Sequence, residues 1–187
     1  AAIVWALQIP GLQIYIFRRH HGDLHKNHMA GETSFPVMLA PLVQAKQCRI
    51  VEGEIRFANA STIHLCHCQH EKDKYKYQGP EIHVLIVDEA THFSESIYRF
   101  LRARVRMGAN SLKIPEALKG LFPRVILCTN PGGVGHNWVK RGWVTPHKPL
   151  TVWRTGKPDG GFLRQYIPAR VRDNPSLDAE TYEANLM

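Results

Sequence analysis

Two adjacent carboxylates follow a run of apolar residues that favours a buried strand. Residues 82–87 form this run, and Asp88 and Glu89 come directly after it. Because neither ion tolerates a protein core, we expect both at the carboxyl end of a parallel strand, where α/β sheets bind ligands. There Asp88 can hold a Mg²⁺ that bridges two phosphates, and Glu89 can polarise a water that attacks phosphorus. The plain alternative is a solvated strand end that carries two charges.

A second polar strand end follows further along the chain. Residues 125–128 form another apolar run, and Thr129 and Asn130 follow it before a Pro-Gly-Gly turn. On a neighbouring strand, such a pair can hydrogen-bond both the attacking water and the terminal phosphate, and the turn can pass that contact on as a loop movement. Taken alone the segment is an ordinary turn, so the prediction requires Thr129 and Asn130 to lie beside the two carboxylates.

The composition favours a polyanionic partner. Lys and Arg total 24 against 16 Asp and Glu, and eleven His come in addition. A basic excess of this size suits sequence-independent contacts with the phosphates of nucleic acid, although a charge that only keeps the protein in solution is the alternative. No stretch of about 18 apolar residues occurs, so a membrane span is excluded.

Several basic residues are candidates for contacts with DNA or for an arginine finger, a cation that reaches the γ-phosphate of a neighbouring subunit. They are Arg18, Arg19, Arg102, Arg104, Arg106, Lys140 and Arg141. The arginines at 102, 104 and 106 are expected on one helix, where contact with DNA or solvent is the alternative. A plain surface role is the alternative for the two at 18 and 19. Trp138 and Trp143 are expected to pack under the sheet, with Lys140 and Arg141 facing outward; the alternative is that these four residues bind single-stranded nucleic acid.

The segment 64–70 combines His and Cys in a way that invites a zinc site. On a strand, Cys66 and Cys68 would share one face with His64 and His70. However, Cys-x-Cys on an extended strand wraps a tetrahedral ion poorly, and no second Cys pair with ligand spacing exists, so an ordinary strand is favoured. Four cysteines do not make a disulfide framework in a chain of this size, and a reducing cytoplasm is the simpler setting.

The elements that must position these residues follow from hydrophobic periodicity. Strands are expected at 12–17, 82–87, 125–128 and 162–167, with a hairpin of 54–57 and 63–66. Helical structure is expected over 22–47 with interruptions at Pro36 and Pro41, after an N-cap at Ser94 as far as Val105, over 138–144, and from Leu177 with Asp178 as N-cap. Short strands alternating with helices predict an α/β fold around a mainly parallel sheet.

In this order, the motifs resemble the large subunit of the tailed-phage terminase. The resemblance runs through the segments 14–19, 77–79, 87–90, 101–106, 129–133, 136–140, 166–169 and 173–175, and so covers nearly the whole chain. The block from Asn-Pro-Gly-Gly to Trp-Val-Lys and the block from Ile-Pro-Ala to Asp-Asn-Pro are together the more specific parts. Each motif alone is a weak signal.

The resemblance implies the ATPase half of a DNA-packaging motor with a P-loop NTPase-like fold of the ASCE/RecA-like type, using ATP and Mg²⁺. In that family Asp88 matches the Walker B ligand of Mg²⁺ and Glu89 the catalytic carboxylate. Thr129 and Asn130 match the motif that couples hydrolysis to translocation of double-stranded DNA into a capsid. The resemblance also implies the portal protein and the small terminase subunit as partners, a homo-oligomeric ring, and action in the host bacterial cytoplasm, transiently at the procapsid, from a phage or prophage gene.

One departure from the family limits this interpretation. The sequence contains no G-x-x-x-x-G-K-[ST] loop, and the family places that loop just before a helix whose tail corresponds to residues 1–7. We therefore expect residues 1–187 to be an N-terminally truncated ATPase domain that ends before a nuclease domain. Without the loop to cradle phosphates, this chain is expected to bind ATP very weakly and not to hydrolyse it. The alternatives are a helicase or translocase core, and a non-catalytic remnant that binds DNA or a capsid partner.

Overall fold

The computed structural model describes residues 1–108 and 112–173. The chain divides into two compact units, Ala1–His136 and Asn137–Met187. The helix expected from Leu177, with its N-cap Asp178, lies outside the described residues, as does the Asn-Pro part of the closing motif at 174–175. No helix in the described part of the chain is both long and apolar enough to span a bilayer.

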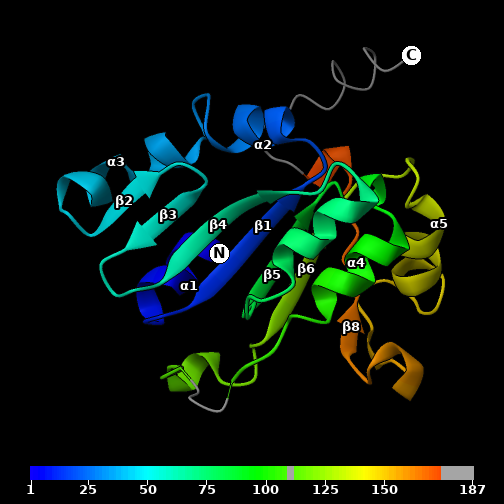
Figure 1. The fold of residues 1–187 in the computed structure, drawn as a ribbon. Coiled ribbons are helices and arrows are strands. Elements are labelled where there is room, and N and C mark those ends of the chain that lie inside the picture. The colour runs from blue at the N-terminus through cyan, green and yellow to red at the C-terminus, as the bar shows by residue number, and fades with distance from the viewer. Residues whose placement is uncertain (109–111, 174–187) are drawn as a thin grey trace. The chain divides into compact units, whose positions relative to one another are not determined.

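The first unit is built on a six-stranded sheet in the order β2-β3-β4-β1-β5-β6 (Figure 1). Four neighbouring strands are parallel: β4 (Thr62–His67), β1 (Gln13–Arg18), β5 (Val84–Asp88) and β6 (Arg124–Cys128). An antiparallel hairpin of β2 (Cys48–Val51) and β3 (Glu54–Phe57) extends the sheet beyond β4. The prediction of an α/β fold with a mainly parallel sheet is confirmed, and so is the hairpin of β3 and β4. Strand β2 was not predicted.

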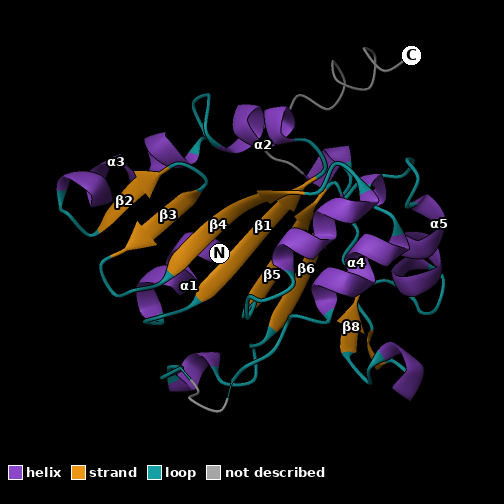
Figure 2. Ribbon diagram, in the orientation of Figure 1, coloured by secondary structure: helices purple, strands orange, loops and turns teal. Residues whose placement is uncertain are grey.

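Helices cover both faces of the sheet in the first unit (Figure 2). On one face, α1 (Ala2–Gln8) and α3 (Phe35–Gln44) bury Ala6 and Leu39 against Ile14 and Ile63. On the other face, the 3₁₀ segment η1 (Glu71–Tyr77) and α4 (Glu95–Arg102) lie over the parallel strands, and the Tyr77 ring meets the Phe17 ring edge-on at 4.7 Å. Because β1 is covered on both sides, its sequence is a continuous apolar run and not an alternating one.

The helical stretch expected over 22–47 is two helices, α2 (His21–His28) and α3, and the break does not fall at the prolines. Pro36 lies in the first turn of α3 and Pro41 lies inside it. A proline in the first turn costs little, because the N–H that it lacks would have no partner there, so Pro36 begins a helix and does not interrupt one. The expected interruption at Pro36 was wrong for that reason, and the one at Pro41 was wrong because α3 continues through it as far as Gln44.

Ser94 caps α4 as predicted, since the Ile97 N–H donates to Ser94 Oγ at 3.2 Å. The helix ends at Arg102, and Val105 forms an isolated parallel bridge with Ile82 instead. The placement of Arg104 and Arg106 on the same helix as Arg102 was therefore wrong. Pairing with the segment that leads into β5 replaces the helical hydrogen bonds there.

The second unit carries its own small sheet. The helix expected over 138–144 is α5 (His136–Val139) followed by a π-helical turn, Lys140–Val144. The strand expected over 162–167 is β8 (Leu163–Gln165), which pairs antiparallel with β7 (Val152–Arg154) in a two-stranded sheet. Elsewhere in the described residues, 3₁₀ turns are found at η2 (Ala90–His92), η3 (Glu116–Leu118), η5 (Lys157–Asp159) and η6 (Val171–Asp173).

Candidate functional site

Asp88 and Glu89 converge on one cation at the carboxyl end of β5. Adjacent residues of a straight strand point to opposite faces, but Glu89 has φ 53° and ψ 54°, in the left-handed region. Arg18 therefore reaches both carboxylates, with Nη1 3.2 Å from Asp88 Oδ2 and Nη2 3.7 Å from Glu89 Oε1. A non-glycine residue in this conformation costs about 1–2 kcal/mol, which the surrounding contacts must offset.

The strand register explains why Arg18 is the residue that meets them. Phe17 pairs with Val87 across β1 and β5, so the next residue of each strand, Arg18 and Asp88, lies at the same edge. A second contact comes from α2, which lies at the carboxyl ends of β1 and β4 (Figure 1). His28 Nε2, in the last turn of that helix, is 3.3 Å from Asp88 Oδ2.

These neighbours hold Asp88 in its charged form. A hydrogen bond with His28 lowers the pKa of Asp88 below its ordinary value, burial acts in the opposite direction, and the nearby Arg18 lowers the pKa further. The Asp88 and Glu89 side chains remain 25% and 24% exposed, so solvent reaches both carboxylates. We define the strand-end site as Asp88, Glu89, Arg18 and His28.

The donor set of this site fits Mg²⁺. Mg²⁺ in proteins takes oxygen ligands, commonly one or two carboxylates together with waters and phosphate oxygens. Asp88 and Glu89 supply carboxylate oxygens at one strand end, where Arg18 now pairs with both of them and would have to share them with the ion. Two carboxylates alone make a weak site, so tight binding would need phosphate oxygens as further ligands.

The second polar strand end lies beside the first. Cys128 pairs with Asp88 across β5 and β6, so Thr129 follows at the same edge. The Thr91 N–H donates to Thr129 Oγ1 at 3.0 Å, and the two threonine hydroxyl oxygens are 2.8 Å apart. Thr91 Oγ1 also donates to the carbonyl of Asn130 at 3.0 Å. The turn after β5 and the loop after β6 are thus joined by side-chain hydrogen bonds.

Thr91 is the residue of this region that sequence reasoning missed. It is buried, and its carbonyl accepts from the Gly135 N–H at 2.7 Å. Gly133 has φ +73°, and a Cβ there would lie 2.6 Å from the Thr91 carbonyl oxygen, so only glycine fits. The position of Thr91, two residues after Glu89, is the sequence signal that could have identified it as part of this region. His28 was also missed, and nothing in its local sequence points to Asp88.

The remaining arginine candidates are spread over the first unit. Arg19 follows Arg18 and is not among the residues that contact Asp88 or Glu89 in the described structure. Arg102 lies over the Tyr98 ring, with 5.8 Å from Cζ to the ring centroid, and Arg104 lies over the Phe100 ring at 4.3 Å.

Arg104 and Arg106 lie at the opposite end of β5 from the carboxylates. The Ile82 N–H donates to the Arg104 carbonyl, and the Arg106 N–H donates to the Ile82 carbonyl. At roughly 3.3 Å per residue, the six residues from Ile82 to Asp88 span about 20 Å. Neither arginine can therefore reach the strand-end site of its own chain.

In the second unit, Lys140 and Arg141 are exposed, in agreement with their expected outward placement. Trp138 is buried, and its ring meets the Trp143 ring edge-on at 5.7 Å. The two tryptophans therefore pack on each other, and their expected packing under the sheet stays a prediction.

The His and Cys segment behaves as a packed strand. Strand β4 ends at His67, so the expected strand as far as His70 was too long. Burial raises the pKa of both Cys66 and Cys68 to about 12, which keeps the thiols protonated. His64 lies 3.1 Å from Glu54 and 2.9 Å from Gln13. Over residues 1–108 and 112–173, no group of three or more His, Cys, Asp or Glu is placed to hold a metal ion.

A comparison with protein families shows which family this chain belongs to. A family model described as "Terminase large subunit, T4likevirus-type, N-terminal" matches residues 2–113, more than half of the chain. This chain belongs to that family. The resemblance found in the motifs is thereby confirmed, and the chain is terminase large-subunit sequence from a DNA-packaging system. No curated protein matches the chain.

The matched range contains most of the site. Arg18, His28, Asp88, Glu89 and Thr91 all lie between residues 2 and 113 of the terminase match. Thr129 and Asn130 lie beyond it, and they join the site through their hydrogen bonds with Thr91.

Proposed function

We propose that this chain is the ATPase region of a phage terminase large subunit, which couples ATP hydrolysis to translocation of double-stranded DNA into a capsid. The observation that carries the proposal is the convergence of Asp88 and Glu89 at one strand end, beside Thr129 and Asn130 at the next. Family membership supports it independently.

The proposal assigns each residue a separate task. Asp88 would hold Mg²⁺, which when bound neutralises charge on phosphate oxygens, and Glu89 would orient a water and accept its proton. Arg18 would position both carboxylates, since it contacts each of them. Thr129 and Asn130 would hydrogen-bond water and phosphate, and Thr91 would pass their movement to the turn that carries Glu89.

We further propose a P-loop NTPase-like fold in which residues 1–187 form part of the ATPase domain. Among the described strands β6 pairs only with β5, although Val125, Ile126 and Leu127 form an apolar run. These three side chains are only half-buried, and an apolar strand at a sheet edge is prone to unwanted pairing. A strand carrying the phosphate-binding loop would fit at that edge. Without such a loop, the chain by itself would bind ATP very weakly and would not turn it over.

The same proposal includes the partners and setting of a packaging motor. Double-stranded DNA, the portal protein and the small terminase subunit would be its partners, and the whole protein would act as a homo-oligomeric ring. It would work in the host cytoplasm and transiently at the procapsid. These assignments follow from the terminase family.

The first test is the gene upstream of Ala1. We expect it to encode a Gly-rich loop ending in Lys-Ser or Lys-Thr, and a gene without one would contradict the packaging ATPase. The second test is DNA-stimulated ATP hydrolysis by the protein extended through that loop, with and without Glu89→Gln. Unchanged hydrolysis in the variant would remove Glu89 from its catalytic role. An inactive unsubstituted protein would favour a remnant that only binds DNA or a capsid partner.

A helicase core remains the second candidate for one reason. The run Asp-Glu-Ala-Thr at 88–91 also suits the helicase machinery. A helicase would need a second lobe of the same fold further along the gene, whereas a terminase needs a nuclease with an acidic metal-binding cluster. The family match favours the terminase.

A further inference from the structure

The β2–β3 hairpin sets two exposed arginines directly against each other. Arg49 on β2 pairs with Arg56 on β3 in the antiparallel register. Directly opposed residues of such strands have Cα atoms about 4.5–5.5 Å apart, and like charges at this spacing destabilise the pair. The arrangement lowers the stability of the free protein, so the stability of the hairpin does not explain why both positions are arginine.

A third cation stands next to this pair. Lys46 lies in the connection from α3 to β2, is exposed, and has φ 56°, in the left-handed region. Neither Lys46 nor Arg49 has an acidic partner within 4.0 Å among the described residues. Arg56 pairs with Glu54 through Nε at 2.6 Å, which leaves its two terminal nitrogens available. Most of the positive charge here is therefore not compensated within the first unit.

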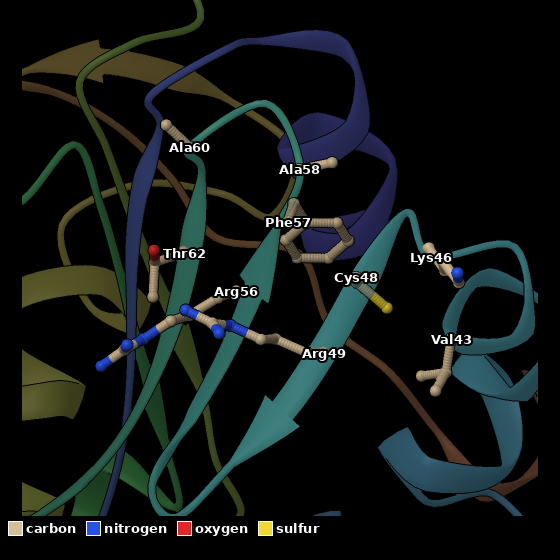
Figure 3. Close-up of a pocket in the computed structure, with 9 residues that line it drawn as sticks. All are labelled: Val43, Lys46, Cys48, Arg49, Arg56, Phe57, Ala58, Ala60 and Thr62. Carbon is tan, nitrogen blue, oxygen red and sulfur yellow. The ribbon is translucent and has the colours of Figure 1, made fainter.

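The three cations border one cleft of about 590 Å³. Figure 3 shows Arg49 and Arg56 side by side on the hairpin, with Thr62 beyond them and Lys46 on the other side of β2. No acidic side chain lines the cleft, and a hydroxyl and several apolar groups complete it. The lining residues are Val43, Lys46, Cys48, Arg49, Arg56, Phe57, Ala58, Ala60 and Thr62.

The partner that fits this surface carries repeated phosphates. A guanidinium binds phosphate oxygens through two parallel hydrogen bonds, and two neighbouring guanidinium groups can serve successive phosphates of one strand. The Thr62 hydroxyl, in register with Arg56, can donate to the same backbone. The net charge of +8 adds long-range attraction for a polyanion.

We propose that Lys46, Arg49, Arg56 and Thr62, the hairpin patch, bind the phosphate backbone of duplex DNA without reading its sequence. The choice of duplex DNA as the polyanion rests on the proposed function, whereas the charge of the patch does not. The patch is separate from the strand-end site, because the hairpin and β5–β6 occupy opposite ends of the sheet. None of these residues was among the DNA-binding candidates of the sequence.

The test is binding of the chain to a fluorescently labelled duplex of random sequence, followed by anisotropy over a range of salt concentrations and without ATP. The variant Arg49→Gln/Arg56→Gln removes two phosphate contacts. Loss of two contacts should make the negative slope of log affinity against log salt shallower by about 1.8 and weaken binding tens of fold near 0.1 M salt. A slope equal to that of the unsubstituted protein would overturn the proposal.

Two further variants separate the patch from general charge and from folding. Lys72→Gln/Lys113→Gln removes the same charge from exposed positions outside the patch, and should reduce the slope by far less than the arginine variant. Arg49→Lys/Arg56→Lys keeps the charge and should keep the slope. If the arginine and lysine removals change the salt slope equally, the proposal is overturned. Far-ultraviolet circular dichroism checks that each variant is folded. Because no ATP is present, the result does not depend on whether Glu89 is catalytic.

Discussion

The strand-end site and the hairpin patch both concentrate charge on the same sheet, but they differ in how far that charge is compensated within the molecule. At the strand-end site, Arg18 lies 3.2 Å from Asp88 and 3.7 Å from Glu89, and the His28 ring lies 3.3 Å from Asp88, so the carboxylates have partners inside the molecule. At the hairpin patch, Arg49 and Arg56 are opposed and only one acidic side chain, Glu54, touches them in the described structure. Charge balanced inside the molecule suits a preorganised chemical site, whereas uncompensated charge suits a partner that supplies the counter-charge.

Breaking the charge balance at the strand-end site should have a large effect on stability. Arg18→Ala would leave two adjacent carboxylates with only His28, and should lower the free energy of unfolding by about 1–3 kcal/mol, between the values for exposed and buried ion pairs. Urea unfolding at neutral pH measures this change. The matched variant Arg49→Ala should lose much less, and an equal loss in both variants would contradict the comparison.

The loop after β6 approaches Thr91 closely at Gly133. Gly133→Ala places a Cβ 2.6 Å from the Thr91 carbonyl oxygen at φ +73°, and should cost about 2 kcal/mol or more through clash and backbone strain. Gly132→Ala shares the positive φ but meets nothing within 4 Å, so it isolates the cost of strain. Thermal unfolding should rank Gly133→Ala as clearly less stable. The reverse order would mean that the loop does not pack on Thr91.

Removal of the Thr91 hydroxyl should destabilise the same contact between the two loops by less. Thr91→Val keeps the shape and the backbone N–H bond to Thr129 but removes the two hydrogen bonds of the Thr91 hydroxyl, and should cost about 1–2 kcal/mol. The same substitution at exposed Thr33 should fall within about 0.5 kcal/mol of the unsubstituted protein. Chemical denaturation of both variants provides the measurement. A loss at Thr33 as large as at Thr91 would remove the case for the link between the two loops.

Acid should weaken the hairpin side of the sheet before it weakens the strand-end site. Burial lowers the pKa of His64 below its ordinary value of about 6.5, with Glu54 acting in the opposite direction. The unfolded chain then binds more protons than the folded one just below pH 6.5, so stability falls as the pH drops through this window. Asp88, whose pKa is lowered, keeps its contribution above about pH 3.9 and loses it only in stronger acid.

The measurement for this prediction is the unfolding free energy at pH 7.5 and 5.5. His64→Gln should reduce the loss between these two values, while His67 and His83, whose pKa values burial also lowers, maintain part of it. A variant that loses as much stability as the unsubstituted protein would show that His64 does not titrate in this range.

The smallest expected effect lies in the like-charged pair itself. Replacing Arg49 with Thr removes the repulsion and introduces a residue that favours strands, so stability should rise by about 0.2–1 kcal/mol. The same variant should bind duplex DNA less tightly. A loss of stability on this change would indicate that the two arginines support the hairpin, which would remove the argument for a partner.

The parts of this molecule that sequence reasoning predicted are those encoded in neighbouring residues. The strand ends at Asp88 and Thr129 follow apolar runs, and the cap at Ser94 precedes an apolar helical pattern, so each feature is visible within a few positions. Parallel pairing then brings the two strand ends together.

The features that were missed depend on contacts between distant segments. His28 meets Asp88 only because α2 lies at the strand ends, and Arg104 leaves the helix only because its carbonyl accepts from Ile82. The opposed arginines of the hairpin depend on β2, a four-residue strand that was not predicted. Local periodicity contains no information about any of these pairings.

The carboxylates at the end of β5 perform chemistry under the proposed function. Its most direct test is the rate of DNA-stimulated ATP hydrolysis by the protein extended upstream of Ala1, compared with the same protein carrying Glu89→Gln. We predict that the substitution lowers the rate by at least about 100-fold, since it removes a general base, while duplex DNA still binds through the hairpin patch. An active extended protein whose rate is unchanged by Glu89→Gln would contradict a catalytic role for Glu89.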